Sequence, residues 1–108
     1  MGYTDAFSVD ELVDQKHKFV NKVVVVNGQL TKYEMGPGAF VWPIKLTVEG
    51  ERWQIIAKCK ISRFQSDHWK LKPHLDAFMG KTIGLKVLAD NYTITAMKFG
   101  ENEFSLRA

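Results

Sequence analysis

β-branched and other apolar side chains recur largely at every second position along five segments between residues 22 and 99. The segments are 22–31, 40–48, 53–61, 81–89 and 92–99. This period of two is typical of strands that bury one face, so the chain is expected to be mostly β. The residues that share the inward phase form the predicted core: Val24, Val26, Leu30, Ile44, Leu46, Ile55, Ala57, Cys59, Ile83, Leu85 and Val87.

Two residues inside these segments predict local irregularities. Gly28 interrupts the first segment, and a glycine within a strand predicts a bulge or a sharp coil. Pro43 interrupts the second segment and has no amide donor, which predicts a bulge or an edge position there. The turn at 49–51 predicts that the second and third segments pair as a hairpin.

Two short helices are expected outside the strands. Ser8 and Glu11 have the spacing of a capping box, which predicts a helix over about residues 8–18. Pro73 suits the first position of a second helix, and Gly80 suits its end. The apolar face of this second helix is expected to comprise Leu75, Phe78 and Met79.

Three strands, a short helix and two further strands form the element order of the OB-fold, a five-stranded Greek-key barrel. The chain resembles an OB-fold protein over about residues 22–99, with Gly28 where such barrels bend their long first strand. The stretches VDELVDQKHKFVNKVVVVNGQLTKYE and HLDAFMGKTIGLKV are similar to the small stand-alone OB proteins grouped as tRNA-anticodon-binding-like. The resemblance implies an all-β fold with short helices, one of them between the third and fourth strands, and a nucleic-acid-binding role. An SH3-like barrel is the competing fold, but a helix before the fourth strand fits it poorly.

Length and composition indicate one domain over residues 1–108. The 108 residues are 45% hydrophobic and 25% charged, which is typical of an ordinary globular domain. Residues 100–108 are expected to be either a frayed tail or a short extra edge strand. No segment has the length of a transmembrane helix, and the N-terminus lacks the pattern of a signal peptide, so a cytoplasmic protein is expected.

The sequence offers little support for catalysis. Cys59 is the single cysteine, and its phase in the third segment predicts burial rather than a reactive thiol. His68 and His74 could form at most a weak metal site, because no third nitrogen or sulfur ligand lies nearby in the sequence. We therefore expect a protein that is not an enzyme and that uses no metal or cofactor.

The positive charge is concentrated in the second half of the chain. Residues 1–50 contain five Lys and no Arg against six acidic residues, whereas residues 51–108 contain ten Lys and Arg against six. Six of these cations lie between residues 52 and 72, and Asp67 is the only acidic residue in that range. Such a cluster attracts polyanions, although a small basic protein can also carry lysines for solubility alone.

A site for single-stranded nucleic acid needs cations along a groove and aromatic faces on which bases stack. On OB-folds this groove crosses the second and third strands, between the loops that join strands one to two and four to five. The residues expected to contact phosphates are Lys45, Lys58, Lys60 and Arg63, and those expected to stack are Tyr33, Phe40 and Tyr92. The alternative role for each of these three aromatic side chains is packing in the core rather than stacking on a base. Bulging at Pro43 would also alter the exposure of Trp42.

The sequence thus predicts non-enzymatic binding of single-stranded DNA or RNA with little sequence preference. The alternative is an OB-fold module for protein–protein interaction, with Val41 and Ile56 as an apolar patch and the N-terminal helix as a docking element. Salt dependence distinguishes the two, because phosphate binding weakens steeply with added salt.

Overall fold

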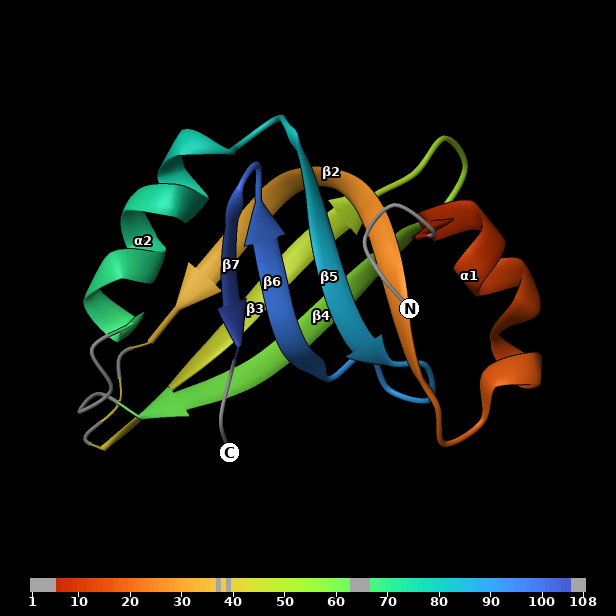
Figure 1. The fold of residues 1–108 in the computed structure, drawn as a ribbon, viewed down its shortest axis with the longest axis horizontal. Helices are drawn as coiled ribbons and strands as arrows, with labels where there is room; N and C mark the ends of the chain where they lie inside the picture. Colours follow the sequence, from red (N-terminus) through yellow and green to blue (C-terminus); the bar gives the residue numbers. More distant parts are fainter. Residues whose placement is uncertain (1–5, 37, 39, 63–66, 106–108) are drawn as a thin grey trace.

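The computed structural model describes residues 6–36, 38, 40–62 and 67–105, without the side chains of residues 67–69. Seven strands and two α-helices make up most of it, and the helices lie at opposite ends of the molecule (Figure 1). The elements in chain order are β1 (Phe7–Ser8), α1 (Val9–Gln15), the 3-10 helix η2 (Lys16–Phe19), β2 (Val23–Met35), β3 (Val41–Glu49), β4 (Gln54–Ser62), α2 (Asp67–Ala77), β5 (Thr82–Leu88), β6 (Ile94–Phe99) and β7 (Asn102–Ser105).

All seven strands belong to one sheet, in the order β4-β3-β2-β5-β6-β7, with β1 paired to β2. Every pair along this path is antiparallel, while the short β1 pairs parallel to β2. The predicted mostly β fold is therefore confirmed. The sheet has two strands more than the five expected: β1 was not predicted, and β7 is the extra edge strand that was one alternative for the C-terminal residues.

β2 bends strongly along its length and is shared by two neighbours (Figure 1). Its first half pairs with β5 and its second half with β3, and Gln29 pairs with both. The irregularity predicted at Gly28 lies slightly further on, because the register with β3 shifts between Leu30 and Lys32. This shift reverses which side of β2 each later side chain faces.

Gly28 itself allows a close approach between elements. A Cβ atom there would lie 2.4 Å from Val48 Cγ1 and 2.7 Å from Val9 Cγ2. Both neighbours are buried and β-branched, so neither can easily move aside. The glycine therefore lets α1 pack directly over β2 and β3.

Gly28→Ala is expected to lower the free energy of unfolding by about 1–3 kcal/mol, the usual cost of an overpacked core. Urea unfolding measures this. In a Val48→Ala background the cost of Gly28→Ala should fall without vanishing, because Val9 still crowds the new methyl group. An equal cost in both backgrounds would contradict the contact with Val48.

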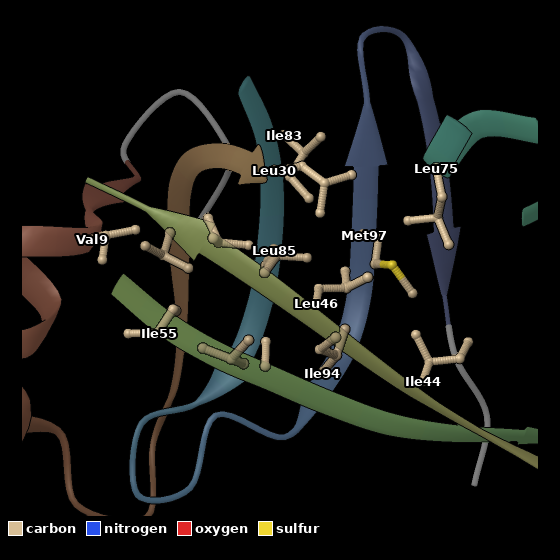
Figure 2. Packing of buried hydrophobic residues seen from close by; sticks show 14 of the residues in the cluster. Val9, Leu30, Ile44, Leu46, Ile55, Leu75, Ile83, Leu85, Ile94 and Met97 are labelled. Atoms are coloured by element: carbon tan, nitrogen blue, oxygen red, sulfur yellow. The ribbon is translucent and has the colours of Figure 1, made fainter. Parts of the chain in front are cut away.

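The predicted core is buried, with one exception. Ten of the eleven predicted side chains are at most 3% exposed, and many of them gather between the β3–β4 and β5–β6 parts of the sheet (Figure 2). Cys59 is only half-buried, although it packs against the same cluster. Its neighbours of the same phase on β4, Ala57 and Ile61, are at most 2% exposed, so the greater exposure is local to Cys59.

Pro43 does not disturb β3. Its register with β4 is continuous from Val41 opposite Ser62 to Glu49 opposite Gln54, so the predicted hairpin is confirmed without a bulge at the proline. The side chains of Val41, Pro43 and Lys45 consequently keep the outward phase that the alternation predicts. The pairing of β3 with β2 ends at Ile44, opposite Met35, so Pro43 lies just beyond that ladder, which agrees with the alternative of an edge position.

The first helix agrees with its sequence signals. The amide of Glu11 donates to Ser8 Oγ at 3.1 Å and the amide of Ser8 donates to Glu11 Oε1 at 3.3 Å, which completes the capping box. Val9 and Leu12 are fully buried, so the apolar stripe of α1 packs on the domain. The helical stretch continues as η2 to Phe19, close to the expected end.

The second helix begins earlier than predicted. Pro73 was placed at its first position, but α2 begins at Asp67 and Pro73 lies inside it. Buried Leu71 and Leu75, one turn apart, hold the helix on the sheet on both sides of the proline, which outweighs its missing amide donor. Its apolar face also differs from the expected one, since Phe78 is half-buried and Met79 is exposed.

Asp10 joins α1 to the β3–β4 turn. Its carboxylate accepts hydrogen bonds from the amides of Glu51, Arg52 and Trp53 at 2.9–3.2 Å. Desolvation acts to raise the pKa of Asp10, but these amides, together with the Arg52 charge, outweigh it and leave the pKa below its usual value. A Cβ atom at Gly50 would lie 2.7 Å from Asp10 Oδ1, so the glycine permits this contact.

Acid is expected to weaken this link. Because the pKa of Asp10 is lower in the folded state, the carboxylate stabilises the fold above its unfolded-state pKa and loses that effect as pH falls toward the folded value. Asp10→Asn should therefore lower the urea midpoint most at neutral pH, and its difference from the unmodified protein should shrink toward about pH 3. A difference that stays constant over this range would show that the carboxylate charge is not involved.

Candidate functional site

Three of the predicted phosphate-contacting lysines lie together on the outer face of the β3–β4 hairpin. Lys45 and Lys58 are directly opposite each other, and Lys60 follows two positions along β4, opposite Pro43. All three side chains are exposed. Opposite residues have Cβ atoms about 5 Å apart, and alternate residues of a strand are about 7 Å apart. The three lysines therefore form one group, called the lysine cluster below.

The acidic residues near the lysine cluster make other contacts. Glu34 lies opposite Lys45 on β2, but its carboxylate lies 3.5 Å from Lys32 Nζ. Within the described part of the chain, no carboxylate lies within 4.0 Å of Lys45, Lys58 or Lys60. By contrast, Arg52 at the hairpin turn is paired with Asp14 at 2.9 Å. The cluster thus presents positive charge that the surrounding protein does not neutralise by direct contact.

The two apolar residues of the proposed protein-docking patch do not lie together. Val41 lies opposite Ser62 on β4, and Ser62 is six positions along that strand from Ile56. At the rise of a strand this is about 20 Å. The lysine cluster lies between them. Both residues are exposed, but the described residues of this face form no continuous apolar patch joining them.

Tyr33 lies on the other side of the sheet from the lysine cluster. The register shift between Leu30 and Lys32 turns Tyr33 inward, where it is half-buried against the core. Its hydroxyl donates to Asp76 of α2 and accepts from Lys72 Nζ at 3.1 Å, and the same Nζ lies 5.7 Å from the ring centroid. Tyr33 thus joins β2 to α2.

The same contacts shift two ionisable groups. The hydrogen bond from Tyr33, followed by that from Lys72, lowers the pKa of Asp76. The hydrogen bonds with Tyr33 and then with Asp76 raise the pKa of Lys72. Both shifts favour the charged forms, which keeps the contact between the helix and the strand intact near neutral pH.

Phe40 and Tyr92 lie at different ends of the lysine cluster. Phe40 is 69% exposed and precedes Val41, at the Lys60 end. Tyr92 lies in the β5–β6 connection, and its carbonyl oxygen accepts the amide hydrogen of Lys58 at 3.1 Å. Its side chain is half-buried, and this burial raises the pKa of its hydroxyl. Lys16 Nζ lies 4.8 Å from the centroid of its ring.

Arg63 lies outside the described residues, as does the side chain of His68.

The two tryptophans of the β3–β4 hairpin region differ in exposure. Trp42 is half-buried against the core, with its ring over Gly36, whereas Trp53 at the hairpin turn is 48% exposed.

Comparison of the chain with protein-family models, with curated proteins and with solved structures found no match. What the site can do therefore rests on its own side chains.

Of the groups considered for catalysis, Cys59 and His74 have described side chains. Burial raises the pKa of the Cys59 thiol to about 12, so it stays protonated at neutral pH and is a poor nucleophile. His74 stacks on Phe99 with 5.8 Å between ring centroids. Among the described residues, no three His, Cys, Asp or Glu side chains gather in a way that could hold a metal ion. No helix among the described residues is long and apolar enough to cross a membrane.

Sequence reasoning did not single out Lys16, and it considered Lys72 only as part of the basic cluster and Asp76 only beside the histidines of a weak metal site, not as partners of Tyr33. Lys16 belongs to a polar run that was read only as the end of the first helix, and its contact with Tyr92 joins residues far apart in the chain. The spacing of Lys72 and Asp76, four apart on a helix, does indicate an ion pair. That spacing does not indicate that the Tyr33 hydroxyl hydrogen-bonds both side chains.

Proposed function

We propose that this chain is a non-enzymatic OB-fold domain whose β3–β4 face binds single-stranded DNA or RNA with little sequence preference. The lysine cluster supplies the phosphate contacts, with Arg63 as a further candidate. Phe40, beyond the Lys60 end of β3, and Tyr92, whose carbonyl oxygen accepts the amide hydrogen of Lys58, are the proposed stacking residues. Tyr33, also a stacking candidate, would need to leave its contacts with α2 in order to stack on a base.

The strand connections support an OB-type arrangement. β2 is bent and shared between β3 and β5, and α2 lies between β4 and β5 in the chain. Lys58 of β4 also forms a parallel bridge with Thr93, immediately before β6. In a five-stranded Greek-key barrel the third and fifth strands approach each other, and this bridge lies where such an approach is needed. β1 and β7 would then be additions to the barrel.

The observation that carries the functional proposal is the cross-strand pair Lys45 and Lys58. Like charges directly opposite each other on a sheet are destabilising. Lys60 adds a third positive charge, and no carboxylate of the described residues pairs with any of the three. A polyanion bound across this face would convert that repulsion into attraction and would release its own counterions.

The test is a titration of labelled single-stranded DNA and RNA oligonucleotides at several salt concentrations, followed by fluorescence anisotropy. Each phosphate contact on a single strand contributes about −0.7 to the slope of log affinity against log salt, so three lysines predict about −2. The affinity should fall about 20-fold between 50 mM and 200 mM salt. Absence of binding at the lower salt concentration would overturn the proposal and would favour a protein-interaction module.

A further inference from the structure

Lys16 lies outside the sheet, yet it contacts a residue that touches the lysine cluster. It is the first residue of η2, and its ammonium group lies 4.8 Å from the Tyr92 ring centroid. Tyr92 in turn accepts the backbone amide hydrogen of Lys58. Lys45, Lys58, Tyr92 and Lys16 therefore follow one another across β3, β4, the β5–β6 connection and η2.

The backbone of Tyr92 is in an unusual conformation. Its φ is 59°, in the left-handed region that bulky residues rarely adopt. The conformation is fixed by two backbone hydrogen bonds, from Tyr92 to Leu88 at 2.8 Å and from Lys58 to Tyr92 at 3.1 Å. Glycine or asparagine would adopt it more easily, so the tyrosine adopts it at a conformational cost. Strain of this kind often marks a residue whose side chain has a function.

We infer that Lys16 is a further phosphate-binding residue of the proposed nucleic-acid site, and that the Tyr92 ring positions it. This inference rests on the proposed function. The bound strand would cross β3 and β4 from Lys45 to Lys58 and continue over the β5–β6 connection toward η2.

The charge surroundings of Lys16 fit this role. An ammonium group over an aromatic ring is held by the ring's negative face and keeps its hydrogen-bond donors for another acceptor. The nearest acidic residues in the same segments have other partners: Asp14 pairs with Arg52, and Asp90 accepts the amide hydrogen of Asn21 at 3.0 Å. Lys16 has no carboxylate within 4.0 Å among the described residues.

The first test compares Lys16→Met with Lys18→Met, which removes an exposed lysine from the same 3-10 helix. Lys16→Met should reduce the magnitude of the salt slope by about 0.7 and weaken binding about fivefold at 0.1 M salt. Lys18→Met should change the slope much less. Thermal unfolding of both variants checks that the fold is retained, and Lys16→Gln provides a second neutral replacement.

The second test separates positioning by Tyr92 from a structural role. Tyr92→Gly relieves the backbone conformation and removes the ring, so it should reduce the magnitude of the salt slope in the unmodified chain but leave the slope nearly unchanged in the Lys16→Met background, whereas any loss of base stacking lowers affinity in both backgrounds without changing the slope. Tyr92→Phe keeps the ring and should restore both affinity and salt slope. An equal change of the salt slope from Tyr92→Gly in both backgrounds, or no change in either, would show that the ring does not act through Lys16.

The two proposals fail in different ways. If the unmodified protein does not bind single-stranded oligonucleotides at low salt, the proposed function is wrong. If it binds, and Lys58→Ala lowers the salt slope while Lys16→Met and Lys16→Gln leave it unchanged, the proposed function stands and the role of Lys16 is overturned.

Discussion

The double substitution Lys58→Ala and Lys60→Ala is expected to weaken binding of single-stranded oligonucleotides about 25-fold at 0.1 M salt. Both side chains are exposed on the same face of β4, and Lys58 is directly opposite Lys45. Each lost phosphate contact removes about 0.7 from the magnitude of the salt slope, so the double variant should lose about 1.4. Fluorescence anisotropy at several salt concentrations gives the affinity and the slope from one set of titrations.

A matched control separates local contacts from overall charge. Lys70→Ala with Lys81→Ala removes the same two charges, from exposed positions on α2 and just before β5. Long-range attraction alone would weaken binding equally in the two double variants. A clear difference in the salt slope supports direct phosphate contacts on β4, and an equal slope would contradict them.

Much of this face could be predicted from the sequence because a strand has only two sides. Once Ile44 and Leu46 are assigned to the core, Lys45 must face outward, and the same reasoning applies to Lys58 between Ala57 and Cys59. The turn at 49–51 then aligns the two lysines across the hairpin. Pro43 does not change this result, since the register passes through it without a shift.

The surroundings of Tyr33 could not be predicted in the same way. A single register shift between Leu30 and Lys32 decides which side of β2 its side chain faces, and no residue there marks the position of the bulge. The start of α2 was missed for a related reason. A local rule placed Pro73 at the first position, whereas burial of Leu71 against the distant sheet extends the helix before it.

The contact between α2 and the end of the sheet depends on an aromatic cluster. Phe99 of β6 is fully buried and contacts three rings: His74 at 5.8 Å, Phe78 at 5.6 Å and Phe104 at 6.0 Å between centroids. His74 lies in the last turn of α2, Phe78 directly follows the helix, and Phe104 lies on β7. One side chain therefore joins the helix, β6 and the last strand.

Phe99→Ala is expected to lower the free energy of unfolding by about 3–5 kcal/mol, because the removed ring leaves a cavity and its three ring neighbours lose their shared contact. Phe40→Ala is the matched control, since the same atoms are removed from a side chain that is 69% exposed, and it should cost much less. Urea unfolding measures both. Phe99 lies at the opposite end of β6 from Thr93, the residue that bridges to Lys58, which is about 20 Å at the rise of a strand, so folded Phe99→Ala protein should keep the salt slope of the unmodified chain. A loss below about 1 kcal/mol would mean that the ring is not buried as described, and the docking of α2 on β6 would then be wrong.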